Sequence, residues 1–247
     1  MKYALNFFAK HDIICIMKIK YINHSGFILE NDTCIIMIDC CGLSKENAVF
    51  RDCAAKPLYI LASHVHSDHF DPGIMSFGGE KRKWILSEDI RNVVSPSNDI
   101  FFISKGKIYR DENVIIKAYG STDEGVSFYI ETGGLRLFHA GDLNNWHWSE
   151  EETPEDAAKN EQFFLEELAL IAKEHPELDV AMFPVDSRMG KDFERGAEQF
   201  LDSIKVGLFI PMHFWDDMKS ASGFKPAAEK KGCRFAEIRA AGDVFEF

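Results

Sequence analysis

The sequence predicts an α/β (α+β) protein in which two β-sheets pack face to face with helices outside. Two observations predict it. The chain contains two successive series of short β-favouring runs, and helical patterns are interspersed with the second series. No internal repeat and no linker-like tract interrupts the 247 residues, which are enough to bury one substantial core.

The first series of strands occupies the first third of the chain. Strands are expected at residues 19–22, 26–29, 34–38, 58–61 and 84–86. Asn23-His24-Ser25 and Glu30-Asn31-Asp32 separate the first three strands with residues typical of turns. Ser87 is a candidate N-cap for a helix at residues 88–94.

The second series begins at residue 114 and merges into helices. Strands are expected at residues 114–119, 126–131 and 135–139, with Thr132-Gly133-Gly134 as a hairpin turn. Thr153 and Pro154 predict the start of a helix, whose core face would include Phe164, Leu168 and Ile171. Further strands are expected at 180–184, 208–212 and 244–247, and further helices at 193–204 and 225–231.

Composition and charge limit the classes of function. Six cysteines without C-x-x-C spacing favour free thiols in a reducing compartment, and no stretch approaches the roughly 20 apolar residues of a membrane span, so a cytoplasmic location is expected. The formal net charge of −12 opposes the phosphate backbone of nucleic acids, which favours a small-molecule substrate. The oligomeric state stays open.

The N-terminus differs from the rest of the chain. An apolar patch at residues 3–9 is interrupted by Lys10, His11 and Asp12, which is too early for a signal peptide. Met17 resembles a second protein start that opens a strand. We therefore expect an N-terminal extension of little functional weight at residues 1–16 and one domain at residues 17–247.

The most informative segment is Ser63-His64-Val65-His66-Ser67-Asp68-His69. It places three histidines and one carboxylate within six residues. Imidazole nitrogens and carboxylate oxygens are the usual donors to zinc and related divalent ions. The segment follows a buried strand and precedes Asp71-Pro72, a helix start, so the ligands would lie on a tight loop at a strand end. Solvated loop histidines rarely show this spacing by chance, and the pattern predicts a metal site.

Other chemically active residues also lie at the ends of predicted strands. Gly141-Asp142 follows the strand at 135–139, His213 follows the strand at 208–212, and His24 lies in the first turn. With these residues in this order, the chain resembles the metallo-β-lactamase fold superfamily. The branch that it resembles most is that of the L-ascorbate-6-phosphate lactonase-like, Zn-dependent hydrolases. The resemblance spans Met17 to about Trp215.

The resemblance implies a four-layer αββα sandwich of two mixed β-sheets, with a one- or two-metal site between the sheet edges. Carried over by position, His64 and His66 would hold metal one, Asp68, His69 and His213 would hold metal two, and Asp142 would bridge the two ions. Asp68 would also orient the attacking water, which makes it the expected catalytic residue. The implied cofactor is Zn²⁺, as one or two ions, with Mn²⁺ or Fe²⁺ as alternatives.

One position departs from the family pattern. The family usually supplies another histidine to metal one from the loop that corresponds to residues 119–125, and here that loop has none. Asp123 is the candidate substitute, and an oxygen-richer site would lean away from zinc towards manganese, iron or magnesium. Alternatively, Asp123 makes only a turn hydrogen bond, and metal one is weakly held or absent.

Four further residues each carry two interpretations. His139 is a possible metal ligand, although a buried, hydrogen-bonded strand histidine is the commoner role. His24 either contacts the substrate or a metal ligand, or is a turn histidine with satisfied hydrogen bonds. Trp146 either walls the pocket or packs into the core, and Arg188 either grips an anionic group or forms a structural ion pair.

The leading function is a metal-dependent hydrolase that uses a metal-activated water on an ester, lactone or phosphodiester bond. The missing histidine motivates an alternative, which is a metal-binding scaffold or sensor on the same fold with little or no turnover. Redox chemistry at a diiron centre is a third hypothesis, because some proteins on this fold carry such centres, typically with a flavin domain.

Overall fold

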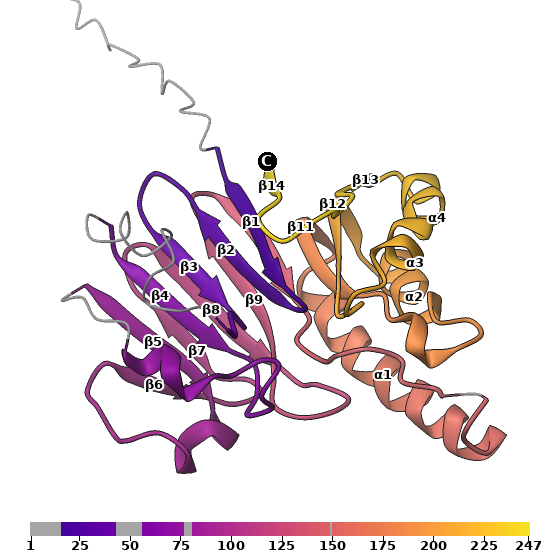
Figure 1. Cartoon of the computed structure of the whole chain (residues 1–247), viewed down its shortest axis with the longest axis horizontal. Coiled ribbons are helices and arrows are strands. Elements are labelled where there is room, and N and C mark those ends of the chain that lie inside the picture. Colours follow the sequence, from indigo (N-terminus) through magenta and orange to yellow (C-terminus); the bar gives the residue numbers. More distant parts are fainter. Residues whose placement is uncertain (1–15, 43–55, 77–80, 149) are drawn as a thin grey trace, which may run out of the picture.

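Two β-sheets of seven strands each form the centre of the protein (Figure 1). The computed structural model describes residues 16–42, 56–76, 81–148 and 150–247. The strand order is β14-β1-β2-β3-β4-β5-β6 in the first sheet and β13-β12-β11-β10-β9-β8-β7 in the second. The N-terminal part of the chain therefore builds one sheet and the C-terminal part the other, except that β14 returns to the edge of the first.

The first sheet combines antiparallel and parallel strands. Its members are β1 (Lys18–Asn23), β2 (Gly26–Glu30), β3 (Ile35–Ile38), β4 (Leu58–Ala62), β5 (Arg82–Ser87), β6 (Ile100–Ile103) and β14 (Val244–Glu246). Strands β14, β1, β2 and β3 pair antiparallel, whereas β3, β4, β5 and β6 run parallel. Strand β3 is buried on both faces, which explains its unbroken apolar sequence: Ile36 and Ile38 belong to the main core, and Ile35 and Met37 to a second cluster.

The second sheet is mixed in the same way. Its members are β7 (Ile108–Arg110), β8 (Val114–Tyr119), β9 (Ser127–Thr132), β10 (Leu135–His139), β11 (Glu177–Pro184), β12 (Lys205–Met212) and β13 (Arg234–Phe235). Strands β7 to β10 pair antiparallel, and β10 to β13 run parallel. The predicted hairpin turn joins β9 to β10, with φ of 57° at Gly133 and 79° at Gly134.

Helices pack on the second sheet, and shorter helical turns pack on the first. Figure 1 shows α1 (Pro154–Glu174), α2 (Arg195–Ser203), α3 (Met218–Gly223) and α4 (Lys225–Lys230) grouped beside β11, β12 and β13. Thr153 caps α1, and the predicted core face of Phe164, Leu168 and Ile171 is buried. On the first sheet, two 3₁₀ helices contribute Ile74 and Ile90 to the second cluster. The predicted sandwich of two mixed sheets is confirmed.

The prediction of a helix at residues 88–94 is wrong in type and length. The structure has a 3₁₀ helix at Glu88–Asn92, and the Ser87 side chain makes no capping hydrogen bond. Pro96 disfavours helical backbone at the residue before it, which keeps the segment short. Strands β6, β7 and β13 and helix α3 were not expected from the sequence.

The loops of interest gather at one edge between the sheets. Strands β3, β4, β10, β11 and β12 have parallel neighbours, and each is followed within three residues by polar residues: Asp39, the histidine loop, Asp142, Asp186 and His213. The carboxyl ends of parallel strands meet at the same edge of a sheet, where open α/β proteins bind their ligands. The topology therefore brings residues far apart in the sequence to one place.

Both ends of the expected domain lie in the first sheet. The Met17 amide donates to the Phe247 carbonyl at 3.0 Å, and the Phe247 amide donates to the Met17 carbonyl at 3.0 Å. Of the predicted extension at residues 1–16, residues 1–15 lie outside the described residues. In the described part of the chain, no helix is long and apolar enough to cross a membrane.

Candidate metal centre and active-site cleft

The histidine loop is a tight turn fixed by local contacts. The amide of His69 donates to the carbonyl of His66 at 3.0 Å. The Asp89 carboxylate accepts the amide of Val65 at 2.8 Å, which ties the loop to the neighbouring 3₁₀ helix. These contacts bring two imidazoles together, with His64 Nε2 and His66 Nδ1 3.0 Å apart.

Two glycines let neighbouring loops approach the histidine loop. Gly125 has φ of 69°, and a Cβ there would lie 2.0 Å from the Ser63 carbonyl oxygen. Gly141 has φ of 55°, and a Cβ there would lie 3.0 Å from the Ser63 Cβ. Only glycine suits both the backbone and the space at these positions. The two loops can therefore place Asp123 and Asp142 beside the histidines.

Three groups of donor atoms lie at this edge. They are His24, Asp68, His69 and His213; then His64, His69 and Asp142; then His66, Asp123 and Asp142, with the donor atoms of each group within 4.8 Å of one another. Zinc binds nitrogen at about 2.0–2.1 Å, so two ligands of one ion lie roughly 3–4 Å apart. The spacing within the groups is close to what a shared ion requires.

Asp142 lies between these groups and is 4% exposed. Its Oδ1 is 3.1 Å from His69 Nε2 and 3.4 Å from His213 Nε2. Its Oδ2 is 3.5 Å from His64 Nε2. The two oxygens of one buried carboxylate thus face different imidazoles, which is the arrangement of a carboxylate that bridges two ions.

Several buried polar atoms here make no hydrogen bond of acceptable geometry with a described residue, even where an oppositely charged group lies 3.1–3.4 Å away. They are both ring nitrogens of His24, Nε2 of His69 and Oδ1 of Asp142. Leaving a buried donor or acceptor unpaired costs about 1–3 kcal/mol each. A cation would satisfy these atoms together, so the residues present fit one or two divalent ions.

The sequence across this region matches a known family. A profile described as the Beta-lactamase superfamily domain matches residues 18–157, which include the histidine loop and Asp142. The chain belongs to this superfamily.

Curated relatives extend the match over nearly the whole chain. The UPF0173 metal-dependent hydrolase of Desulforamulus reducens is 40% identical over 253 residues, which cover 93% of this chain and 100% of the relative. The UPF0173 metal-dependent hydrolase of Nanoarchaeum equitans is 27% identical over 234 residues, which cover 87% of this chain and 94% of the relative. The predicted family and the predicted class of enzyme, a metal-dependent hydrolase, are confirmed.

A solved structure supports the fold independently. A metallo hydrolase from Ignicoccus hospitalis superposes with a TM-score of 0.67 at 18% identity, covering 94% of this chain and 98% of that chain. At this identity, the likeness shows the fold alone. The metallo-β-lactamase sandwich is therefore established for this hydrolase by sequence and by structure.

Two carboxylates that were not expected at the site orient histidines of the hydrolase. Asp39, 1% exposed, accepts His69 Nδ1 at 2.8 Å, and Asp186, 1% exposed, accepts His213 Nδ1 at 3.0 Å. Each contact turns the Nε2 atom of the ring towards Asp142, as carboxylates do for the histidines of metal sites. Both residues follow buried strands, β3 and β11, so the strand-end signal that singled out Asp142 was present for them too.

The buried histidines and aspartates of the site shift one another's pKa values and partly neutralise one another's charge. Burial lowers the pKa of His69, but Asp142 and Asp39 outweigh it and raise the pKa to about 10. Burial also lowers the pKa of His213, but Asp142 and Asp186 raise it to about 8. Burial raises the pKa of Asp142, but His213 and His69 outweigh it and hold the pKa well below its usual range. In the ion-free protein, these two rings therefore carry protons at neutral pH.

His139 lies outside the donor groups. Its ring is fully buried, Nε2 lies 2.8 Å from the carbonyl oxygen of Ser25, and Nδ1 accepts the amide of Gly141 at 3.2 Å. Because the backbone occupies both nitrogens, neither can bind an ion in this arrangement. These contacts are those of a buried strand histidine whose ring is held by the backbone.

The donor groups open onto a cleft of about 370 Å³. Outside the donor groups, its lining includes Trp146, Trp148, Trp215, Arg188, Glu152 and Asn160. Trp146 Nε1 donates to the Asp142 carbonyl at 2.7 Å, and its ring lies 5.2 Å from that of His213. Trp146 therefore lines the cleft beside Asp142 and His213.

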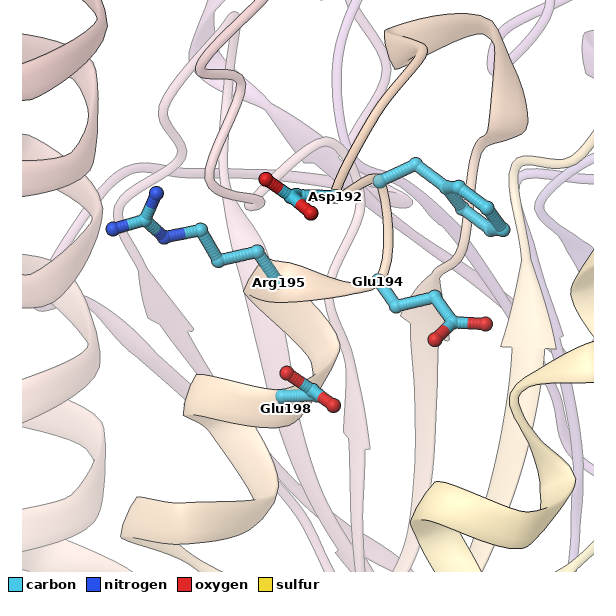
Figure 2. Close-up of a pocket in the computed structure, with 5 residues that line it drawn as sticks. Asp192, Glu194, Arg195 and Glu198 are labelled. Atoms are coloured by element: carbon cyan, nitrogen blue, oxygen red, sulfur yellow. The ribbon is translucent and has the colours of Figure 1, made fainter. Parts of the chain in front are cut away.

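A larger pocket, of about 510 Å³, shares no lining residue with this cleft (Figure 2). Its lining is Asp192, Phe193, Glu194, Arg195 and Glu198. Figure 2 shows that no imidazole is among the residues drawn, and Arg195 pairs with Glu161 of α1 at 2.8 Å. None of the donor groups lies there, so the smaller cleft is the candidate active site.

Replacing either orienting carboxylate should weaken metal binding. Asp39→Asn and Asp186→Asn each remove the charge that fixes a histidine ring, and we expect metal affinity to fall roughly 10- to 100-fold. Competition with a chelator of known affinity measures this, and circular dichroism checks the fold. Asp192→Asn, in the pocket of Figure 2, is the matched control and should leave affinity unchanged. Unchanged affinity in both site variants would contradict the assignment.

Metal binding at pH 7 should release protons. His69 and His213 have raised pKa values in the ion-free protein, about 10 and about 8, and an ion displaces their protons. Because the folded pKa values are raised, protonation stabilises the ion-free fold fully below about pH 6.5, and this stabilisation is lost as the pH rises through 8 and 10. Calorimetry in buffers of different ionisation enthalpy should detect roughly one to two protons per binding event. No release at pH 7 would refute the proposed protonation states.

Proposed function

We propose that the hydrolase binds two divalent ions, one on each side of Asp142, and hydrolyses an ester, lactone or phosphodiester bond of a small molecule in the cleft. The observation that carries the proposal is the placement of the two Asp142 oxygens, 3.1 Å from His69 Nε2 and 3.5 Å from His64 Nε2. With a single ion, either His64 or the pair of His69 and His213 would face an oxygen of Asp142 with no cation between them.

The first ion would be held by His64, His66, Asp142 and Asp123. In this assignment Asp123 takes the place of the histidine that the family usually supplies. Its support is that the donor atoms of His66, Asp123 and Asp142 lie within 4.8 Å of one another. His66 and Asp123 are also exposed in the cleft, so this ion would face the substrate. The scaffold hypothesis was motivated by a missing ligand for the first ion. If Asp123 supplies that ligand, this motivation no longer applies.

The second ion would be held by Asp68, His69, His213 and Asp142. His24 lies in the same group, with its Nε2 3.3 Å from Asp68 Oδ2. Burial lowers the pKa of His24, so its ring is neutral. The ring can therefore contact the Asp68 carboxylate without placing a second positive charge beside the ion. We assign His24 to the positioning of Asp68.

Zinc is the ion that we propose. The donor set mixes imidazole nitrogens with carboxylate oxygens, which suits zinc. Mn²⁺ and Fe²⁺ are the alternatives, because Asp123 and Asp142 would supply half of the protein ligands of the first ion. Metal analysis of the purified protein decides between them.

The chain's own groups would position the reactants around these ions. A bound divalent ion acts as a Lewis acid that polarises the substrate and activates water. Asp68 is partly exposed at the cleft. The oxygen that lies 3.3 Å from His24 Nε2 would also bind the second ion, and the other oxygen would accept a hydrogen bond from the attacking water. His24 holds the pKa of Asp68 well below its usual range, against the effect of burial. Asp68 therefore stays ionised and acts as an acceptor that orients the water.

The expected setting of this activity is the cytoplasm, with small molecules and not nucleic acids as substrates. Four cysteines in the described part of the chain are free and buried: Cys34, Cys40, Cys41 and Cys233. Free thiols are usual in reducing compartments, and the formal net charge of −12 repels polyanions. Recovery of the native protein from an oxidising compartment, or tight binding to RNA or DNA at physiological salt, would contradict this part of the proposal.

Metal content should depend on Asp123. Protein purified without added metal should contain about two equivalents of ion, Asp123→Ala about one, and Asp123→His about two, because an imidazole restores the missing ligand. Elemental analysis by mass spectrometry measures this. Glu124→Ala, in the same loop and equally exposed, is the matched control and should keep both ions. Two ions retained in Asp123→Ala would remove Asp123 from the site.

Turnover should depend on Asp68. With a panel of aryl esters, lactones and aryl phosphodiesters, Asp68→Ala should lower kcat at least about 100-fold, because it loses both a ligand and the acceptor for water. Steady-state kinetics on metal-loaded protein measures this. Wild-type activity on none of the three bond classes would contradict the proposed substrates, and full activity of Asp68→Ala would contradict the role of Asp68.

A further inference from the structure

The cleft contains a positively charged side chain, that of Arg188, which is not among the proposed metal ligands. Arg188 lies in the short 3₁₀ helix Ser187–Met189 that follows β11. Its Nε donates to Asp186 at 3.0 and 3.1 Å, and its Nη2 donates to Asp186 at 2.5 Å. Asp186 also accepts the ring of His213 at 3.0 Å, so its carboxylate holds both groups at once.

The Asp186 contact leaves part of the guanidinium free. Arginine has five N–H donors, and only those on Nε and one side of Nη2 reach Asp186. The donors on Nη1 make no hydrogen bond with the described residues, and the side chain lines the cleft with 49% of its surface exposed. A structural ion pair explains one edge of the guanidinium, and the other edge faces the cleft.

Trp215 forms a flat face beside this cation. The Arg188 guanidinium carbon lies 4.9 Å from the centre of the Trp215 ring, and the His24 ring lies 4.6 Å from it. Trp215 has φ of 53° and 46% of its surface exposed. A large ring held in strained backbone yet open to solvent adds little to the core, and such strain is typical of ligand-binding sites.

Charge in the cleft is distributed unevenly. Apart from Arg188, the charged lining residue outside the donor groups is Glu152, whose carboxylate accepts Asn160 Nδ2 at 2.8 Å. Asn160 also donates to the Trp146 carbonyl at 3.1 Å, so Glu152 belongs to a chain of contacts that does not include Arg188. Among the described lining residues outside the donor groups, Arg188 therefore carries the one positive charge, and Glu152 does not contact it.

We propose that Arg188 and Trp215 form an anion subsite beside the metal centre, and that the substrate carries a carboxylate or phosphate group next to a flat or apolar body. The guanidinium edge would take two oxygens of the anionic group, since arginine matches such groups with paired hydrogen bonds. The body of the substrate would pack on Trp215, and its scissile bond would lie over Asp142. The assignment of the reacting bond rests on the proposed function.

A pair of matched substrates tests the charge requirement. An aryl ester with a distal carboxylate and its carboxamide counterpart share the leaving group and differ only in charge. Metal-loaded wild-type enzyme should prefer the carboxylate. Arg188→Gln should lower kcat/KM for the carboxylate roughly 10- to 100-fold and change that for the carboxamide less than about 3-fold, with Arg188→Lys between them.

Controls separate an anion subsite from a structural role. Arg195→Gln, which replaces another half-exposed arginine in an ion pair, should leave both substrates unchanged. The metal content of every variant is measured, because Arg188 shares Asp186 with His213. Equal losses on both substrates in Arg188→Gln, or no preference in the wild type, would overturn the subsite.

A binding measurement separates this inference from the proposed hydrolysis. Calorimetry with phenylphosphonate on metal-loaded protein should give a Kd that rises roughly 10-fold or more in Arg188→Gln. Trp215→Leu should weaken the same binding, since it removes the flat face. If no substrate is turned over but phosphonate binding still depends on Arg188, the proposed reaction fails and the subsite stands. Equal phosphonate binding by wild type and Arg188→Gln overturns the subsite whether or not hydrolysis occurs.

Discussion

The interaction on which the rest of this site depends is that of the buried Asp142 carboxylate with imidazoles on two sides. Concentrating so many ligand atoms at one apolar sheet edge is costly unless cations or protons balance them. The backbone is strained at the same edge, with positive φ at His24, Asp39, His213 and Trp215. Strain of this kind persists where the surrounding fold over-determines it. Here two rigid sheets supply that constraint, and the strained residues are candidate ligands or lie next to them.

The fold makes this concentration possible by topology and by close approach. Parallel strands from both sheets end at the same edge, so short loops suffice to bring candidate ligands from β4, β10 and β12 together. Gly125 and Gly141 then remove the side chains that would hold the loops apart. Asp39 and Asp186 fix two rings from behind, and the cleft on the other side is left for the substrate. The same edge of the sheets therefore provides both the rigid support of the histidine rings and the open cleft in front of them.

Much of the fold and many residues of the candidate site were predictable from local sequence, and the rest depends on contacts between distant residues. The histidine loop is a contiguous sequence pattern. Asp142 and His213 each follow a strand that the sequence of that strand predicts. Asp39 and Asp186 were missed because their importance lies in partners 30 and 27 residues away, which spacing does not reveal. His139 and His24 could not be separated by sequence, since only packing shows that backbone groups occupy both nitrogens of His139. The helix expected at residues 88–94 is a shorter 3₁₀ helix, because Pro96 disfavours helical backbone before it.

Anomalous diffraction from crystals of the metal-loaded protein, recorded at the absorption edge of the bound metal, tests the central claim most directly. The account predicts two peaks flanking the Asp142 carboxylate, one near His64 and Asp123 and the other near His69 and His213. A single peak with Asp123 turned away from it would contradict the two-ion centre. Peaks only outside this edge, for instance among the carboxylates around Glu198, would contradict the site altogether.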